Sequence, residues 1–521
     1  MQKILNKAQI LEHDKITIER QGISSIDLME RAAGECVKHL EKIIKNHFRK
    51  IHIVCGKGNN GGDGLVIARI LSEKYSPDNL KINVFIAENS SSKESYEFSH
   101  NYRKLEQCRT INICYLNESN LQLLKDEIFS EHENSIVVDA IYGIGLNKEV
   151  NGSTADIIKL LNLSGLPIIS IDVPSGMYAD VKQESGEKII IQSELTLTFQ
   201  QPKYNLLLSE NGPFCKEFLT IDIGLDQEFL LEADCKNYTI EKKDIVSLLK
   251  KRAKFSHKGN YGHALIIAGS KGKIGAAVLA SKACLKSGAG LLTVHVPASG
   301  TQILQSVLPE AMVSEDLNPQ FISDSPETGK YNCVGIGPGL GTHKETELAF
   351  KQLIQKYQGN LVIDADAINL LAENKTLFAF LPPMSILTPH PKEFDRLTEK
   401  HNTDFERIET AKDLATKHQI ILILKSAHTA IITPSKSVFF NTSGNPGMSK
   451  GGNGDVLTGI LIGLLARGYD PLPTALVGVF IHGYAADKLI EKHSEESILP
   501  SEIINNLSSA LFELEQAKSD L

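Results

Sequence analysis

The residues with the clearest chemical potential form a glycine-rich turn near the start of the chain. Residues 56–64 read Gly-Lys-Gly-Asn-Asn-Gly-Gly-Asp-Gly and directly follow an apolar run that predicts a buried strand. Glycines let a backbone approach a ligand closely, and the free N–H groups of a helix expected to begin near Gly62 attract anions. The side-chain oxygens of Asn59, Asn60 and Asp63 also suit a cation. The spacing matches neither the P-loop nor the dinucleotide fingerprint, and a plain strand-to-helix turn stays the alternative.

Two aspartates end predicted strands further along the chain. Asp139 is followed by Ala-Ile-Tyr-Gly-Ile-Gly-Leu, and Asp172 is followed by Val-Pro-Ser-Gly. In a doubly wound sheet, the carboxyl ends of such strands meet at one crevice. Burial there would raise the pKa of either carboxyl unless a cation or hydrogen bonds compensate. Either aspartate alone could be a cap, but together with the glycine-rich turn they favour a binding site.

A second glycine-rich segment lies near the C-terminus and opens a helix of small and apolar residues. Residues 449–459 read Ser-Lys-Gly-Gly-Asn-Gly-Asp-Val-Leu-Thr-Gly. Phosphoryl transfer needs backbone N–H groups to hold developing negative charge and a carboxylate aimed at the attacking hydroxyl. Gly451, Gly452 and Gly454 could form this anion hole, with Asp455 as the base. An ordinary helix start is the alternative.

Other loops in the C-terminal half also follow predicted strands and carry polar residues. His390 stands between two prolines in a stiff turn, and taken alone it would be a structural histidine. The loops cover residues 335–341, 364–367, 388–393 and 425–429.

Two parallel sheets are needed to bring these loops together. Short apolar runs alternate with helical patterns, which predicts an α/β protein. The polar segment at residues 226–254 predicts a boundary between two domains. The first series of strands covers residues 51–55, 82–86, 136–139, 168–173 and 195–199, after a helix at about 25–45. The second covers 263–269, 291–296, 332–336, 360–364, 385–388, 420–425 and 428–433, before helices at 454–466, 474–492 and 500–516.

Composition sets the remaining bounds. A chain of 521 residues is too long for one ordinary core. A net charge of −8 gives no reason to expect nucleic-acid binding, which needs a basic face. The first residues lack a signal-peptide core, and no apolar run is long enough to span a membrane. The eight cysteines form no CxxC pair, so neither a zinc site nor disulfides are expected and a cytoplasmic location is predicted.

The motifs of the first half resemble the N-terminal epimerase domain of the NAD(P)H-hydrate repair enzymes, over residues 1–230. The similarity runs through Gly-Asn-Asn-Gly-Gly-Asp-Gly, the loops after Asp139 and Asp172, and the segment 199–203. It implies a Rossmann-like three-layer α/β/α domain, with Asp172 as the candidate for proton transfer. It implies potassium ligands at Asn60, Asp139 and Ser175. It implies substrate contacts at Asn59, Asn60, Gly61, Gly62, Asp63, Gly143, Ile144, Gly145, Leu146, Asn147, Lys148, Glu149 and Asp172.

The second half, residues 236–521, resembles the ribokinase-like dehydratase domain of the same family. The similarity begins at His257-Lys-Gly-Asn-Tyr-Gly and continues to the last helices. Two residues depart from the family pattern, one in each half. In the second half Asn453 stands where threonine is usual, and in the first half Tyr204 follows Lys203 where proline or glycine is usual. The resemblance implies adenine-nucleotide contacts at Lys425, Ser426, Ala427, His428, Thr429 and Gly454. It implies contacts to the hydrated dinucleotide at Ala276, Gly339, His390 and Asp455.

Taken together, the resemblances imply a bifunctional enzyme that epimerises the R and S forms of hydrated NADH and NADPH. It would dehydrate the S form at the expense of ADP, using K⁺ and Mg²⁺. The expected partners are these small molecules and further copies of the chain, without nucleic acid or membrane. A kinase of a vitamin precursor or sugar with an accessory Rossmann-like domain is the main alternative. A first half that only binds a protein partner is a third hypothesis.

Overall fold

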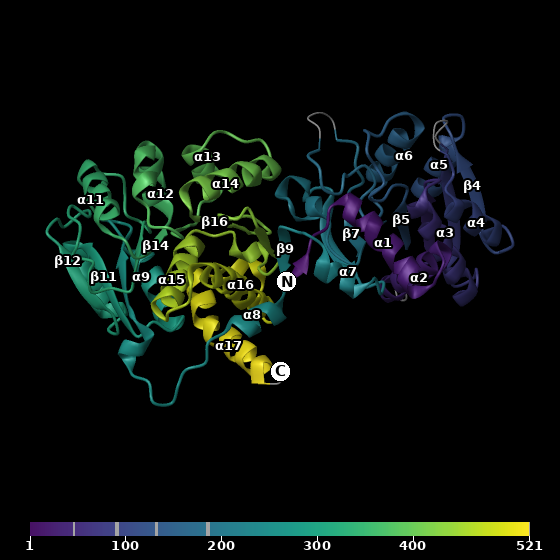
Figure 1. Cartoon of the computed structure of the whole chain (residues 1–521). Coiled ribbons are helices and arrows are strands. Elements are labelled where there is room, and N and C mark those ends of the chain that lie inside the picture. Colours follow the sequence, from purple (N-terminus) through teal and green to yellow (C-terminus); the bar gives the residue numbers. More distant parts are fainter. Residues whose placement is uncertain (45–46, 89–92, 131–133, 184–187, 520–521) are drawn as a thin grey trace. The chain divides into compact units, whose positions relative to one another are not determined.

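The structure is a computed structural model that describes residues 1–44, 47–88, 93–130, 134–183 and 188–519. The chain divides into two compact units (Figure 1). One unit is Lys3–Cys235, and the other combines Met1–Gln2 with Lys236–Leu521. Among the described helices, none is both long and apolar enough to cross a membrane.

The unit Lys3–Cys235 contains a parallel sheet of seven strands in the order β4-β3-β2-β5-β6-β7-β8. This confirms the five predicted strands and adds β4 and β8. The strands are β2 (Lys50–Cys55), β3 (Lys81–Ala87), β4 (Asn112–Leu116), β5 (Ser135–Ala140), β6 (Ile168–Ile171), β7 (Ser193–Phe199) and β8 (Cys215–Ile221). The helices are α1 (Lys7–Gln21), α2 (Ser25–Ile44), α3 (Asn59–Lys74), α4 (Tyr96–Leu105), α5 (Leu121–Ser130), α6 (Gly152–Leu163) and α7 (Gln227–Glu232). Lys45, the predicted end of α2, lies outside the described residues.

Side chains along these strands alternate between two cores on opposite faces of the sheet. Ile51 and Ile53 of β2 belong to a buried cluster with α2, α3 and α4. Val54 belongs to a second cluster with α5 and α6. Helices therefore cover both faces, and the predicted Rossmann-like three-layer arrangement is confirmed.

The strand order reverses between β2 and β5, the place where doubly wound sheets bind ligands. The glycine-rich turn lies here, and α3 begins at Asn59 rather than near Gly62 as predicted. None of the glycines in this turn has a positive φ. Their role is close packing: a Cβ on Gly61 would lie 1.7 Å from the carbonyl oxygen of Gly56. The turn is therefore built by removing side chains and not by left-handed backbone.

The second unit has an eleven-stranded sheet in the order β1-β9-β18-β17-β16-β15-β14-β13-β10-β11-β12. From β9 to β12, the described strands pair in parallel except for the antiparallel pairs β16–β17 and β17–β18. The predicted strands are confirmed, while β1, β9, β12 and β18 were not anticipated. The strands are β1 (Gln2–Lys3), β9 (Asn237–Ile240), β10 (His263–Ile267), β11 (Leu291–Pro297), β12 (Met312–Asp316), β13 (Cys333–Ile336), β14 (Asn360–Ile363), β15 (Ile386–Leu387), β16 (Ile421–Leu424), β17 (Ala430–Ile432) and β18 (Val438–Asn441).

Helices cover both faces of this sheet as well. Ala264 and Ile266 of β10 belong to the large core under α9, α15, α16 and α17, whereas Ile267 faces Phe350 and Leu353 of α11. The helices are α8 (Lys242–Leu248), α9 (Ile274–Lys286), α10 (Ala298–Val307), α11 (Lys344–Lys356), α12 (Ala365–Glu373), α13 (Pro391–Leu397), α14 (Asp404–His418), α15 (Asn453–Ala466), α16 (Pro471–Ile490) and α17 (Pro500–Ser519).

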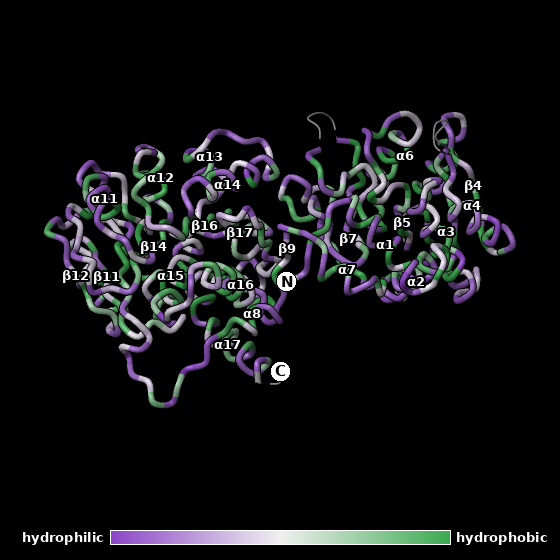
Figure 2. Tube along the Cα trace, viewed as in Figure 1, coloured by the Kyte–Doolittle hydropathy of each residue, from purple (hydrophilic) through white to green (hydrophobic). Residues whose placement is uncertain are grey.

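Helix α15 carries the second glycine-rich segment at its N-terminus and is buried almost all round. Figure 2 shows hydrophobic segments in green along the neighbouring α16. Gly459 lets α15 lie against α9, because a Cβ there would be 2.1 Å from the carbonyl oxygen of Ala280. A helix that is apolar on every side belongs in a protein core. Its N-terminus is thereby held in a fixed place.

The first two residues of the chain belong to the second unit, although the third belongs to the first. Strand β1 pairs with β9 at the edge of the eleven-stranded sheet. The N-terminal ammonium group contacts the carboxylate of Asp244 in an ion pair. The chain therefore passes between the units twice, once after Gln2 and once after Cys235.

Candidate active sites

The unit Lys3–Cys235 contains a cavity with a volume of about 460 Å³ at the reversal of strand order. It is bounded by the glycine-rich turn, the loops after β5 and β6, the end of β7, and helix α1. The predicted contacts that line it are Asn59, Asn60, Asp63, Gly143, Ile144, Gly145, Leu146, Asn147 and Asp172. Four other predicted contacts are not among its lining residues: Gly61, Gly62, Lys148 and Glu149.

An ion pair between Asp172 and Lys203 forms part of the cavity wall. The ammonium nitrogen of Lys203 lies 2.8 Å from Oδ1 of Asp172, and the two side chains are 2% and 9% exposed. Oδ2 of Asp172 accepts a hydrogen bond from the backbone of Ile144 at 3.2 Å. Asp172 also has a φ of 68°, a left-handed conformation that is unfavourable for a residue with a Cβ. The surrounding structure therefore holds the carboxylate against local strain, as is typical of functional sites.

Two further carboxyl groups line the same cavity, Asp14 of α1 and Asp63 of α3. Burial raises the pKa of Asp14 to about 6, the negative charge of Asp172 adds to this, and Lys203 opposes it. Burial also holds the pKa of Asp63 well above its usual range, with further contributions from Asp172 and Asp14. The cavity therefore combines one ion-paired carboxylate with two carboxyl groups that favour the protonated form.

The three predicted potassium ligands come from the start of α3, the end of β5 and the loop after β6. Their oxygen atoms differ in how many hydrogen bonds they already make. Asp139 is fully buried and accepts hydrogen bonds from Ser170, from the backbone of Ile141, and from both the backbone and hydroxyl of Ser175. Burial raises the pKa of Asp139, and these hydrogen bonds partly offset the effect. Only one of them, from Ile141, is a local turn contact, so Asp139 is more than a cap.

Asn60 has the opposite character. Its side chain is 8% exposed, and neither amide atom has a hydrogen-bond partner among the described residues. A buried amide without partners is costly and calls for an explanation. An oxygen-binding cation beside Oδ1 would provide one, and the residue set fits potassium in this respect.

The corresponding pair in the second unit joins Lys425 to Asp364. The ammonium nitrogen lies 2.9 Å from Oδ1 of Asp364 and 4.0 Å from Oε2 of Glu393. Thr388 and Thr458 donate hydrogen bonds to the Asp364 carboxylate at 2.7 and 2.8 Å. Burial lowers the pKa of Lys425, but the Asp364 and Glu393 carboxylates outweigh it, so the pKa lies above its ordinary value. Lys425 is therefore positively charged and fixed in place by its ion pair with Asp364.

Asp455 lies in the first turn of α15, just beyond the left-handed Gly452 at the N-cap. Burial raises its pKa to about 7, the neighbouring Asp364 carboxylate adds to this, and Lys425 opposes it. The adjacent Gly454 lies against the same ion pair: a Cβ there would be 3.5 Å from the Lys425 ammonium. The structure therefore places a carboxyl group near neutrality beside a helix N-terminus and a lysine, which suits proton removal next to a phosphate.

The other residues predicted to contact the dinucleotide surround this group. Gly339 lies against Ala276 and Lys273, and the Lys273 ammonium is 3.4 Å from Asp366. His390 caps α13: its Nδ1 accepts hydrogen bonds from the backbones of Lys392 and Glu393. Burial lowers the pKa of His390, while Glu393 opposes this and Lys425 adds to it. His390 therefore caps α13 through Nδ1. Its Nε2, which the cap does not use, lies 3.4 Å from Oε1 of Glu393.

The predicted nucleotide contacts at residues 426–429 form the turn between β16 and β17, next to Lys425. Its backbone is fixed by hydrogen bonds between Ser426 and Thr429. Asn453, the departure from the family pattern, donates from Nδ2 to the carbonyl oxygen of Met448 at 2.7 Å. The asparagine therefore fixes the segment before α15.

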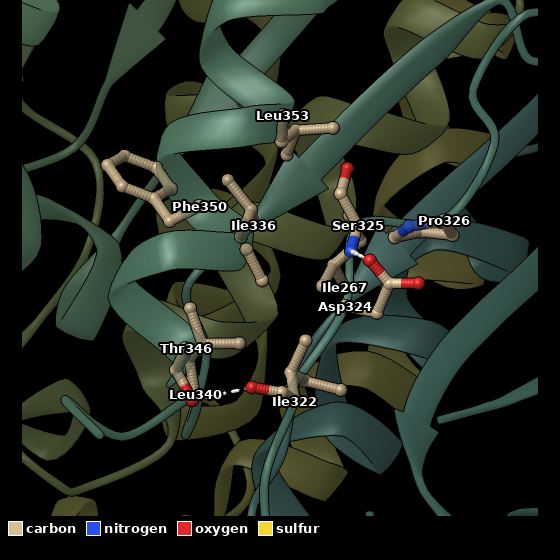
Figure 3. Close-up of a pocket in the computed structure, with 11 residues that line it drawn as sticks. Ile267, Ile322, Asp324, Ser325, Pro326, Ile336, Leu340, Thr346, Phe350 and Leu353 are labelled. Carbon is tan, nitrogen blue, oxygen red and sulfur yellow. Dashed lines mark hydrogen bonds between the residues drawn. The ribbon is translucent and has the colours of Figure 1, made fainter. Parts of the chain in front are cut away.

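A small cavity beneath α11 does not belong to this site (Figure 3). Its volume is about 10 Å³, and its walls include the apolar side chains of Ile267, Ile336, Phe350 and Leu353. A space of this size holds about one water molecule at most. It is a packing gap and not a nucleotide site.

The charged residues that sequence reasoning missed include Asp14, Lys203 and Asp364. Lys203 and Asp364 both stand at or just beyond a strand end, the same signal that identified Asp139 and Asp172. Asp14 lies on α1, a helix that the hydrophobic pattern did not predict. Its start carries a capping box in which the side chains of Asn6 and Gln9 each bond the other's backbone N–H, and this signal is visible in the sequence.

Comparisons with known proteins agree with this division. A family model described as YjeF-related protein N-terminus matches residues 25–204, and one described as NAD(P)H-hydrate dehydratase matches residues 264–509. Proteins named bifunctional NAD(P)H-hydrate repair enzyme are similar over nearly their full length. The relative from Coxiella burnetii is 33% identical, over 97% of this chain and 99% of its own. That from Moorella thermoacetica is 32% identical, over 98% of this chain and 97% of its own.

Among solved structures, the chain is similar to one described as the ADP/ATP-dependent NAD(P)H-hydrate dehydratase from Bacillus subtilis co-crystallized with ATP/Mg²⁺. The identity is 31% and the TM-score 0.48, and the match covers 53% of this chain and 98% of that chain.

Proposed function

Because this chain belongs to the family of bifunctional NAD(P)H-hydrate repair enzymes, we propose that it restores NADH and NADPH from their hydrated forms. Its N-terminal part, residues 1–230, is the epimerase, and its C-terminal part, residues 236–521, is the ADP-dependent dehydratase. The observation that carries this conclusion is the similarity to bifunctional relatives over 97% and 98% of the chain. A vitamin-precursor or sugar kinase is not supported, because the relatives that match both halves of the chain are named as bifunctional repair enzymes.

The hydrated ring carries a hydroxyl at C6, beside the ring nitrogen, and this hydroxyl is a poor leaving group. We assign Asp455 as the base that takes its proton while the oxygen attacks the terminal phosphorus of ADP. A new P–O bond forms, the bond to AMP breaks, and backbone N–H groups at Gly451, Gly452 and Gly454 stabilise the negative charge. The ring nitrogen then expels phosphate, and loss of a proton from C5 restores the double bond. Asp455 suits this task because its pKa of about 7 lies near neutral pH.

Nucleotide binding is assigned to Lys425, the turn at residues 426–429 and Gly454. A positively charged lysine at the N-terminus of α15 suits the phosphates of ADP. The hydrated dinucleotide would contact Ala276, Gly339, His390 and Asp455. Mg²⁺ bound together with the nucleotide would neutralise part of the charge of its phosphates.

Epimerisation is assigned to the cavity of the first unit. The C6 hydroxyl is lost with help from the ring nitrogen and returns to the opposite face of the ring. Asp172, held by Lys203 at 2.8 Å, is the candidate for proton transfer. The substrate contacts are those predicted from the sequence, with the cavity-lining members as the strongest candidates.

We assign potassium to Asn60, Asp139 and Ser175. The unpartnered buried amide of Asn60 supports this assignment. A cation there would supply positive charge near the substrate and fix the loops after β2 and β5. A homo-oligomeric assembly and a cytoplasmic location remain expectations from the sequence.

The function is tested by incubating the protein with a mixture of both epimers of hydrated NADH, with and without ADP. Recovery of reduced-nicotinamide absorbance should require ADP and should consume both epimers. Chromatography without ADP should show exchange of the epimers without recovery. If ADP restored no NADH, the dehydratase assignment would be wrong.

A further inference from the structure

Helix α1 brings a carboxyl group into the epimerase cavity that the proposed function does not yet use. Asp14 lines the cavity together with Asp63, Asp172 and Lys203. It is half-buried, and among the described residues it has no hydrogen-bond or ion-pair partner. A carboxyl group in this position needs either a partner or a proton, because burying an unpaired charge is costly.

The positive charge of Lys203 acts on Asp14, but the lysine has no N–H left for it. A lysine has three N–H donors. Those of Lys203 are directed at Asp172 at 2.8 Å, at the carbonyl oxygen of Phe199 at 2.8 Å and at that of Gln201 at 3.4 Å. Asp172 is therefore the partner of the lysine, and Asp14 stands beside the pair without being part of it.

Helix α1 is held firmly enough to give Asp14 a defined place. The neighbouring His13 ring contacts the carbonyl oxygen of Asp226 at 2.8 Å and stacks on Phe229. Thr17 accepts a hydrogen bond from the backbone of Asp226 at 2.9 Å. At the start of the helix, the Lys7 ammonium bonds the carbonyl oxygen of Gly145 at 2.8 Å. The helix is thus tied to the loop after β5, which also lines the same cavity.

Epimerisation needs an acid as well as a base. The departing C6 oxygen must gain a proton to leave as water, and the water that returns to the other face must lose one. Asp172 is ion-paired and suited to accept a proton, but it cannot supply the first one in the same state. Two carboxyl groups held in different protonation states divide such work.

We propose that Asp14 is the proton donor of the epimerase, working opposite Asp172 as the acceptor. This inference rests on the proposed epimerase function. The O–H bond of Asp14 breaks as the proton moves to the departing hydroxyl, the C6–O bond breaks, and the ring nitrogen supplies the electrons. Water then adds to the opposite face and gives a proton to Asp172, and solvent returns this proton to Asp14. The net reaction changes only the configuration at C6.

The protonation state of Asp14 depends on the charged groups that face it. These are Asp172 and Lys203, together with Asp63, whose pKa the charge of Asp14 raises. Lys57 and Lys93 also line the cavity. Burial and Asp172 hold the pKa of Asp14 near 6. The donor form is therefore present below that pH and is lost as the pH rises through it.

The test compares Asp14→Asn with wild type in the full-length protein, across pH values on both sides of 6. Epimer exchange is followed by chromatography, and the uncatalysed exchange is subtracted. We expect the wild-type kcat/KM to fall as the pH rises, and Asp14→Asn to lose this pH dependence and about 10²- to 10⁴-fold in kcat/KM. Asp14→Glu should recover the pH dependence. Glu12→Gln, an exposed change on the same helix, should behave as wild type.

Two readouts separate this role from a structural one. Thermal melting and ADP-dependent dehydration of the S epimer by the same variant should be unchanged. If Asp14→Asn kept the wild-type rate, or was slower with the same pH dependence, the proton-donor role would be wrong. If wild-type protein exchanged no epimers, the epimerase function itself would be wrong, and the inference with it.

Discussion

The two units each build a site around an aspartate–lysine ion pair, but they expose opposite members of the pair. In the first unit Lys203 is 2% exposed and Asp172 is 9% exposed. In the second, Asp364 is 1% exposed and Lys425 is 23% exposed. The first unit therefore presents a carboxylate to its cavity, and the second presents an ammonium group. This difference matches the chemistry assigned to each: proton transfer at a carbon in one, and phosphate binding in the other.

Each pair also has a second carboxyl group beside it. Asp14 has a pKa of about 6 and Asp455 of about 7, and in both cases burial is the main cause and the paired aspartate the next. The negative member of each ion pair thus helps to hold a neighbour in the protonated form. The same three groups, an aspartate–lysine ion pair and a neighbouring carboxyl group, can therefore serve two reactions. The difference lies in which member of the ion pair is more exposed, Asp172 in the first unit and Lys425 in the second.

Removal of the Asp455 carboxyl should give the largest effect, and it should impair the reaction of the second unit only. We expect Asp455→Asn to lower ADP-dependent dehydration by about 10²- to 10⁴-fold, as is typical for loss of a general base. Epimer exchange should continue. Both reactions are measured on the same preparation, and a near-normal dehydration rate would remove Asp455 from the role of base.

The exposed and the hidden lysine should differ in what their loss disturbs. Lys425→Met should lower dehydration by about 10²-fold or more, by analogy with loss of one anion-stabilising donor. Lys203→Met should leave Asp172 buried and unpaired, at a cost of about 3–5 kcal/mol in the free energy of unfolding of the first unit. Denaturant unfolding followed beside both activities measures these effects. Lys425→Met also leaves the buried Asp364 without its lysine, but Thr388 and Thr458 still donate hydrogen bonds to that carboxylate, so its loss of stability should be smaller. Equal losses of stability in the two variants would contradict the comparison.

The sequence predicted the loops of both sites because each follows an apolar strand and carries residues with little structural reason to be there. It did not predict the edge strands β4 and β8, where several side chains are exposed and the hydrophobic pattern is weak. It also missed α1, whose buried residues are Ile10, His13 and Thr17. Two of these three are polar, so no apolar stripe marks the helix.

The balance of charges in the sites could not be predicted at all. That Lys203 pairs with Asp172, and Lys425 with Asp364, depends on how strands distant in sequence are ordered in each sheet. The left-handed backbone of Asp172 is likewise imposed by its neighbours, since this conformation is unfavourable for a residue with a Cβ, aspartate included. Residue types at strand ends identify a site, while its protonation states require the fold.

A potassium requirement should be confined to the first unit. Replacing potassium by tetramethylammonium should slow epimer exchange and leave dehydration of the S epimer unchanged, because the proposed ligands Asn60, Asp139 and Ser175 all belong to the first unit. Asn60→Leu removes the unpartnered amide and should abolish the difference between the two salts. Equal exchange rates of the wild type in both salts would show that the cation site is wrong.

Asp455 should lower stability where it is ionised. Its pKa is raised from 3.8 to about 7 in the folded protein, so folding disfavours the charged form. Stability is therefore lost as the pH rises through this range, and the full penalty is present above about 7. Asp455→Asn removes the penalty. The melting temperature of the variant should exceed that of wild type above neutral pH, and the difference should shrink as the pH falls; a constant difference would contradict the raised pKa.

The smallest effect concerns the independence of the two units. A fragment beginning at Lys236 keeps every residue of the second unit except Met1 and Gln2. It should fold and dehydrate only the S epimer of hydrated NADH, leaving the R epimer until the fragment 1–230 is added. Chromatography of each epimer over time checks this division of labour. Consumption of both epimers at similar rates by the second fragment alone would contradict it.

The same fragment should be slightly less stable than its counterpart in the whole chain. It lacks strand β1, which pairs with β9 at the edge of the sheet, and it lacks the ion pair between the N-terminal ammonium and Asp244. An edge strand of two residues contributes little burial, so the melting temperature should fall only a little. In the full-length protein, Asp244→Asn removes the ion pair and keeps the strand, and should cause a smaller fall. If the fragment failed to fold, β1 would be an essential part of the second unit, and the two functions would be joined by structure as well as by chemistry.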